Sequence, residues 1–253
     1  MSALATGGMV VICLAVAATI GLILSQRVPD HHLNTESRDA IKLATAVVGT
    51  LSALTLGFLI ASAKTTFDDA DTELRTSVAH IVLLDRVMQQ YGQETSISLT
   101  ELAKLVKSRL DENWDINNTG KVSKAQSPDY GIEPVQAGLR SLVPRNEEQG
   151  ILKIRALEVS SLIAEAHWLL VERGSEGLPG AFLTILVFWL SLLFLTFGLL
   201  APRNGTVIGI VFVCGFSVAG AVFLVIDMAH PYQGLIHLSD EPLRIAMERI
   251  GKS

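Results

Sequence analysis

The residues best suited to do chemistry lie in an uncharged stretch, 43–63, between Lys42 and Lys64. If this stretch is a helix with about 100° between successive residues, seven side chains fall within one arc of roughly 100°. They are Thr45, Val48, Ser52, Thr55, Leu59, Ser62 and Thr66. A face that mixes hydroxyls with apolar side chains is typical of a pore, where hydroxyls contact a partly dehydrated ion and apolar rings exclude water. It is also typical of a helix contact, in which each hydroxyl bonds the backbone carbonyl four residues earlier.

The same stretch carries a second row, in which every fourth residue is small: Thr45, Gly49, Ala53, Gly57 and Ala61. Small side chains at this spacing let helices approach closely in a membrane, so we predict that this row packs against another helix. The neighbouring arc holds large apolar side chains that suit lipid or a protein core: Val47, Leu51, Leu54 and Phe58.

Other residue patterns that carry chemistry are missing from the sequence. The acidic run over 68–73 resembles a calcium loop, but counting from Asp69 the sixth position is Leu74 instead of glycine and the twelfth is His80 instead of glutamate. The histidines form no HExxH pattern, the two cysteines form no CxxC pair, and no Ser/His/Asp elbow occurs. We therefore predict no enzyme activity, no metal site and no cofactor, and we interpret 68–73 as a solvated helix face.

The composition indicates a membrane protein. Hydrophobic residues make up 49% of the 253 residues and charged residues only 18%, whereas a soluble domain carries about 25% charged residues. Four apolar blocks predict spans at 8–24, 43–63, 178–201 and 205–226, because roughly 20 apolar residues cross the hydrocarbon layer. The stretch 64–177 holds 13 Lys/Arg and 18 Asp/Glu, which is the whole net charge of −5. It lacks the basic stripe that nucleic-acid binding requires.

The topology follows from these spans. The first block is expected to be a retained span and not a cleaved signal peptide, because no Lys or Arg precedes it and no small-x-small site follows it. Four spans place both termini and the polar insert on one side. Five flanking basic residues on that side against four on the other do not decide the orientation. The predicted parts are a first hairpin (1–63), the insert (64–177), a second hairpin (178–229) and a tail (230–253).

The insert is predicted to be a helical bundle. Helical spacing continues from Lys64 to Tyr91, where Gly92 ends it, and further helices are expected over 98–114, around Val135 and Leu139, and from an N-cap at Asn146. The Asn-, Gly- and Ser-rich stretch 115–131 predicts a mobile loop. The last helix carries apolar side chains towards the third span: Ile151, Ile154, Leu157, Leu162 and Trp168.

Two features of the second hairpin could have a structural or gating role. Trp189 lies near the middle of the third span with four phenylalanines around it, Phe182, Phe188, Phe194 and Phe197. Interfacial aromatics would cluster at the span ends, so interior packing is predicted, with a gate as the alternative. Asp227 ends the fourth span and is expected to cap or anchor the tail.

Three parts of the sequence resemble a bacterial family of four-span membrane proteins of unknown function that are described as bestrophin homologues. The most specific part is the tail, which carries Asp227, Pro231, Tyr232 and Gly234, followed by Ser239 and Pro242-Leu243. The other parts lie at 49–59 and at 83–86. The order of two spans, helical insert, two spans and short tail matches as well, over nearly the whole chain.

Bestrophins are ring-shaped, usually pentameric anion channels whose second span lines the neck, with termini and helical bulk in the cytoplasm. The resemblance implies a homo-pentamer in the bacterial inner membrane that passes small anions, with the lipid bilayer around it and the insert and both termini in the cytoplasm. Where bestrophins carry an acidic calcium clasp after the last span, this chain has only Asp240-Glu241. The resemblance therefore does not extend to calcium gating.

Residues and resemblance together predict an all-α, bestrophin-like protein with four transmembrane helices and a helical extramembrane insert between the second and third spans. Its expected function is that of an oligomeric, passive anion channel with the second span lining the pore. The alternative is a membrane-anchored oligomeric scaffold or sensor whose insert binds a partner without conducting ions.

Overall fold

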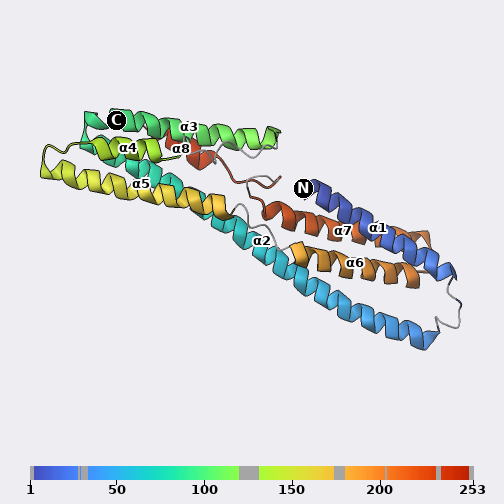
Figure 1. The fold of residues 1–253 in the computed structure, drawn as a ribbon. Helices are drawn as coiled ribbons and strands as arrows, with labels where there is room; N and C mark the ends of the chain where they lie inside the picture. Colours follow the sequence, from blue (N-terminus) through green and yellow to red (C-terminus); the bar gives the residue numbers. More distant parts are fainter. Residues whose placement is uncertain are drawn as a thin grey trace. The chain divides into compact units, whose positions relative to one another are not determined.

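The fold is taken from a computed structural model, which describes residues 3–27, 29, 34–119, 131–173, 180–202, 204–231 and 235–250, with the side chains of 111–119 and 169–173 excepted. All regular elements in these residues are helical, so the all-α prediction is confirmed (Figure 1). In chain order they are α1 (Ala3–Arg27), α2 (Thr35–Tyr91), the 3-10 turn η2 (Gln93–Thr95), α3 (Ser96–Thr119), α4 (Glu133–Ser141), α5 (Glu147–Arg173), α6 (Gly180–Leu200), α7 (Gly205–Met228) and α8 (Glu241–Arg249).

Four of these helices, α1, α2, α6 and α7, contain a stretch that is long and apolar enough to cross a membrane. The four predicted spans coincide with them. Residues 178 and 179, which open the third predicted span, lie outside the described residues. Asn204 caps α7, because its side-chain oxygen accepts a hydrogen bond from the backbone nitrogen of Thr206 at 3.2 Å.

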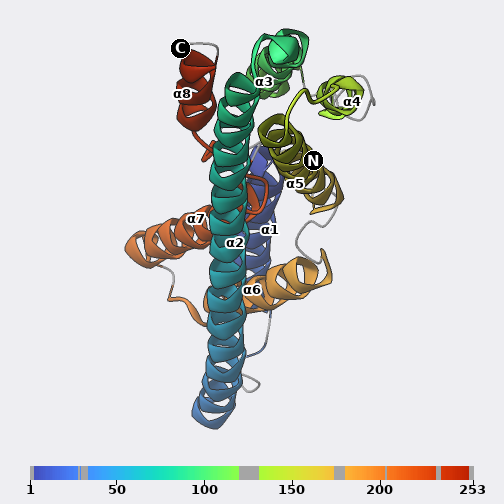
Figure 2. The same ribbon diagram turned by 90° about the vertical axis from the view of Figure 1, so that its left-hand side faces the viewer.

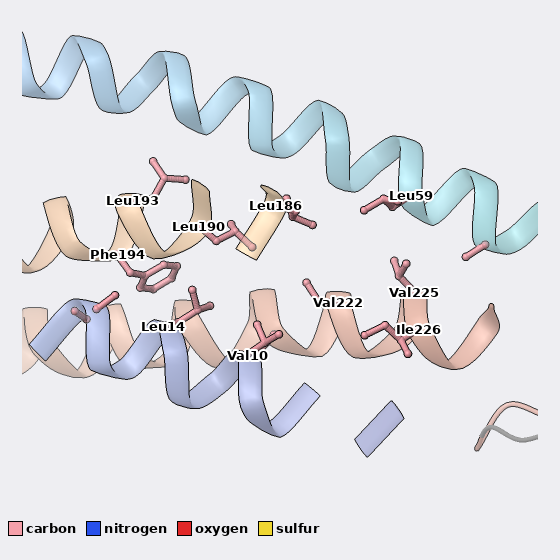
Figure 3. Packing of buried hydrophobic residues seen from close by; sticks show 14 residues of the cluster. Val10, Leu14, Leu59, Leu186, Leu190, Leu193, Phe194, Val222, Val225 and Ile226 are labelled. Carbon is pink, nitrogen blue, oxygen red and sulfur yellow. The ribbon is translucent and has the colours of Figure 1, made fainter. Parts of the chain in front are cut away.

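The chain divides into two compact units, Met1–Phe67 with Gly177–His230 and Asp68–Glu176 with Pro231–Ser253. The first unit holds α1, the first part of α2, α6 and α7, and these helices share one apolar cluster (Figure 3). The labelled members of that cluster are Val10, Leu14, Leu59, Leu186, Leu190, Leu193, Phe194, Val222, Val225 and Ile226. Since lipid tails are as apolar as leucine, the stability of this cluster must come from close packing and not from escape from water.

The closest helix approach in this unit joins α1 to α6 through two glycines. A Cβ atom added to Gly21 would collide with the carbonyl oxygen of Leu195, and one added to Gly198 would collide with the carbonyl oxygen of Ala18. Each glycine therefore lets the backbone of the other helix come into direct contact. The spacing of Ala17 and Gly21 is a small-xxx-small pattern that could have revealed this crossing from the sequence.

The helix α2 runs without a break through both units. Its 57 residues correspond to about 85 Å at the helical rise of ~1.5 Å per residue. The predicted stop is confirmed at Gly92, whose φ of 124° suits glycine and ends the helix. The buried hydroxyl of Thr95 lies 2.7 Å from the carbonyl oxygens of both Met88 and Gly92, so its single proton can be donated to either of these acceptors at the helix end.

The second unit gathers α3, α4, α5 and α8 with the second part of α2 (Figure 2). The predicted N-cap at Asn146 is confirmed, because its side-chain oxygen accepts from the backbone nitrogen of Gln149 at 2.8 Å. The predicted loop 115–131 is wrong at its start, since α3 continues to Thr119. Weak helix formers such as asparagine are tolerated in a last turn. Residues 120–130 of that loop lie outside the described residues.

The face by which α5 packs within its unit is not the face that carries its largest apolar side chains. Its buried residues are Ala156, Val159, Ser160 and Ile163. By contrast, Ile151, Ile154 and Trp168 are 63%, 70% and 58% exposed. This helix is therefore apolar on two sides, of which one is covered and the other is exposed among the residues that the structure describes.

The aromatic residues of the third span differ in their burial. Phe194 is buried in the cluster, whereas Phe182, Phe188 and Phe197 are exposed and Trp189 is half-buried. Within one copy these three phenylalanines are thus not interior residues, although the ring of Phe182 lies 6.5 Å from that of Phe58 on α2. Packing against neighbouring helices stays a prediction. A span in hydrocarbon gains little by turning an apolar ring inward, so exposed rings in one copy are compatible with lipid or with another helix.

Candidate functional site

The hydroxyl arc of the second span faces the other spans of the same chain. Ser52 and Leu59 are only 3% and 2% exposed. Figure 3 shows Leu59 directed from α2 towards Leu186 and Val225. Of the remaining residues of the arc, Thr45, Val48, Thr55 and Ser62 are half-buried and Thr66 is exposed. The structure thus brings these residues onto one face, and that face packs against α6 and α7.

Several hydroxyls of this helix are already hydrogen-bonded to its own backbone. Ser52 donates to the carbonyl oxygen of Val48 at 2.8 Å, and Thr66 donates to that of Ser62 at 3.1 Å. On the opposite face, Thr50 donates to the carbonyl oxygen of Val47 at 2.8 Å. A hydroxyl has a single proton to donate. These three side chains therefore present oxygen lone pairs, and no donor, to a passing ion.

The small-residue row lies on the uncovered side of α2. Gly49 is half-buried, whereas Ala53, Gly57 and Ala61 are exposed, and a Cβ added to Gly57 would meet nothing within 4 Å. The chain's own close crossing uses Gly21 and Gly198 instead. The row is thus available to something outside the protomer.

Residues that were not predicted as site residues complete this uncovered face. Thr50 is exposed, and Leu54 and Phe58 are 71% and 63% exposed. These residues could have been predicted from the hydroxyl arc, because they lie on the opposite side of the helix. A helix with one face in a protein core must present the opposite face outward.

Charged groups flank the span at both ends. Lys42 forms an exposed ion pair with Asp39 at 2.9 Å. Past Lys64, Arg75 pairs with Asp71 at 2.8 Å, and the hydrogen bond between them raises the pKa of the guanidinium above its usual value. No group of three or more His, Cys, Asp or Glu among the described residues is arranged to hold a metal ion.

The predicted tail motif is only partly described. Asp227 is 1% exposed in the last turn of α7, and Pro231 is buried after it. The carbonyl oxygen of Pro231 accepts a hydrogen bond from the backbone nitrogen of Leu238 at 3.1 Å, which folds the tail back on itself. Tyr232 and Gly234 lie outside the described residues, as do His31 and His32 of the first loop.

We expect Asp227→Ala to destabilise the membrane unit without changing ion preference. A polar group this deeply buried must be paired, and its removal strands a partner at a cost of about 1–3 kcal/mol. Thermal unfolding and oligomer size in detergent would measure this loss. Asp39→Ala is the matched control, because its ion pair with Lys42 is exposed and worth ~1 kcal/mol or less. Equal melting temperatures for the two variants would contradict an anchoring role.

Comparison with known proteins identifies the family. The family model of the Bestrophin-like domain matches residues 12–243, which includes most of the first span, the other three spans, the insert and most of the tail. The chain belongs to the Bestrophin-like family. This family is known for anion channels, and its match together with the four apolar helices shows a membrane protein. No curated protein and no solved structure matches the chain.

Proposed function

We propose that this Bestrophin-like protein is a homo-oligomeric channel, with a pentamer expected from the family, that passes small anions passively along its second span. The observation that carries the proposal is the uncovered face of α2, which combines the small-residue row with Thr50 and Leu54 and has no charge between Lys42 and Lys64. Small residues let several copies of one helix approach a common axis, and apolar positions beside them can control wetting.

Two faces of α2 are candidates for the pore lining. The arc from Thr45 to Thr66 is the face predicted from sequence, and it lines a pore only if the span turns away from α6 and α7, because Ser52 and Leu59 are covered there. The face around Thr50 and Gly57 lines a pore in an assembly of unchanged protomers. We propose the second arrangement for the conformation described, since it needs no repacking of the apolar cluster.

The charges predict weak selectivity. An anion entering past Lys42 meets an ammonium that Asp39 already neutralises in part, and the other end carries Lys64 close to Asp68 and Asp71. The hydroxyls of Thr50 and Ser52 offer it no donor, because each already donates to a backbone carbonyl oxygen. A pore of this kind attracts anions by small differences in potential that salt screens within about 10 Å at 0.1 M. Its preference for chloride over potassium is therefore expected to be modest and to fall with ionic strength.

Ion flux from proteoliposomes tests the proposal. We expect purified protein to release chloride above the rate of empty vesicles, and potassium more slowly. If wild-type protein is silent, Val48→Ala with Leu59→Ala would loosen the packing of α2 on the other spans, and continued silence would contradict conduction. The remaining candidate would then be a scaffold or sensor in the same membrane, favoured by the exposed face of α5 outside the four spans.

A further inference from the structure

The charged residues at the start of α2 are unevenly distributed around the helix. At about 100° per residue, Glu36 and Asp39 lie within roughly 40° of Thr50, on the uncovered face that the proposed function assigns to the pore. Lys42 lies about 80° from Thr50 and Arg38 about 120°, both on the same side. The face that would line the pore therefore begins with two carboxylates, and the basic residues lie beside it.

The two carboxylates differ in their partners. The carboxylate of Asp39 forms an ion pair with the ammonium of Lys42 at 2.9 Å, and both side chains are 64% exposed. Glu36 is also exposed, and it forms no ion pair with any side chain that the structure describes. One negative charge is thus partly neutralised and the other is not, so this face carries net negative charge at its start.

Carboxylates are rare in the rest of the first unit. Among the described residues of that unit, the only other one is Asp227, which is buried in the last turn of α7. The stretch of α2 between Lys42 and Lys64 carries no charge. An ion that moves along the uncovered face therefore meets no acidic group of the described part of this unit other than Glu36 and Asp39.

We propose that Glu36 and Asp39 are specificity-determining residues, which form a ring of carboxylates at one mouth of the assembled pore and limit its preference for anions. The inference rests on the homo-oligomeric channel of the proposed function, because the ring exists only where several copies of α2 surround one axis. Rings of acidic side chains favour cations in channels. At ~7 Å in water, one elementary charge changes the local concentration of a monovalent ion by about threefold.

Carboxylates in a first helical turn also stabilise the helix end, because the macrodipole is positive there. Asn34 already caps this end, since its side-chain oxygen accepts a hydrogen bond from the backbone nitrogen of Ser37 at 2.8 Å. The stabilising role requires negative charge near the helix end but on no particular face. The two roles are therefore separated by moving a charge around the helix at nearly the same depth.

Neutralisation of both carboxylates is the first test. We expect Glu36→Gln with Asp39→Asn to raise the chloride-to-potassium permeability ratio by about threefold or more at low salt. The ratio is obtained from the reversal potential of the full-length protein in a planar bilayer under a gradient of potassium chloride. The increase should shrink at about 1 M salt, where the screening length is only about 3 Å. An increase that did not depend on salt would contradict an electrostatic role.

An exchange of the two partners of the ion pair tests position separately from net charge. Asp39→Lys with Lys42→Asp keeps the net charge and leaves the two groups three residues apart, so that they can still pair. The exchange places the ammonium near the Thr50 face and moves the carboxylate away from it. We expect the permeability ratio at low salt to rise by about threefold or more, because an attracting charge replaces a repelling one. A ratio equal to that of the wild type would overturn the proposal.

Arg38→Gln is the matched control. Arg38 directly precedes Asp39 and is exposed, but it lies about 120° from Thr50 around the helix. Loss of its charge should therefore change the permeability ratio less than neutralisation of the two carboxylates does. A change of equal size would mean that the face on which a charge lies does not determine selectivity. Melting temperatures in detergent verify that each variant is folded.

The wild type separates failure of this inference from failure of the channel. Absence of current in the wild-type protein, and in the variant with Val48→Ala and Leu59→Ala, would overturn both. Current in the wild type with an unchanged ratio in the neutralised and exchanged variants would overturn only the role of Glu36 and Asp39.

Discussion

Replacing Gly198 with valine is expected to abolish the folded membrane unit. The new side chain would meet the carbonyl oxygen of Ala18 and the backbone nitrogen of Leu22. Backbone atoms of a helix cannot move aside as a flexible side chain can, so α1 and α6 would have to separate. Overpacking of a well-packed interior costs about 1–3 kcal/mol and sometimes more, and a clash with backbone belongs at or above the upper end. The monodisperse fraction after extraction and the melting temperature in detergent would show the loss.

The matched control is Gly209→Val on α7. A Cβ at Gly209 meets nothing within 4 Å, so the same substitution in another span should leave the melting temperature close to that of the wild type. Equal melting temperatures of the two variants would mean that α1 and α6 are not in close contact at Gly198. Because the crossing holds the apolar cluster together, flux should also disappear in Gly198→Val and persist in Gly209→Val.

The sequence predicted the elements of this fold well because their signals are local. The spans follow from length and hydropathy, the end of α2 from Gly92, and the start of α5 from the cap at Asn146. The loop that was expected to begin at residue 115 was misplaced, since asparagine and glycine content does not fix the last turn of a helix.

Which face of each helix is covered could not be predicted in the same way, because this depends on the neighbouring helices in the fold. Ser52 and Leu59 have the composition of a pore face, and they are covered by spans of the same chain. In hydrocarbon, hydroxyls that bond their own backbone are compatible with lipid, protein or water. The periodicity therefore identified a distinct face of α2 without identifying its neighbour.

The helix α5 illustrates the same limit outside the membrane. Its largest apolar side chains, Ile151 and Ile154, point away from the chain's own core, which is built on the smaller Ala156 and Val159. Its sequence therefore carries two superimposed apolar patterns on one helix, and periodicity alone cannot rank them. Only the structure separates the apolar face that is buried within the protomer from the one that stays exposed.

Two cysteine substitutions at nearly the same depth decide which face of α2 meets the pore. Thr50 and Ser52 are two residues apart and lie on opposite sides of the helix, about 160° from each other at ~100° per residue. Thr50 is exposed, whereas Ser52 is 3% exposed. In a chain without Cys13 and Cys214, we expect a charged, water-soluble thiol reagent to react with Thr50→Cys and to bring chloride flux close to the level of empty vesicles.

The same reagent should leave Ser52→Cys unmodified and its flux unchanged, because the span packs that position against its own chain. Serine and cysteine have nearly the same shape, so this variant also controls for disturbance of the fold. If the reagent modifies Ser52→Cys and leaves Thr50→Cys unmodified, α2 is rotated relative to the described structure and the arc from Thr45 to Thr66 lines the pore. If neither cysteine reacts, the water-filled path lies on another helix, because a charged reagent does not reach a thiol that faces lipid.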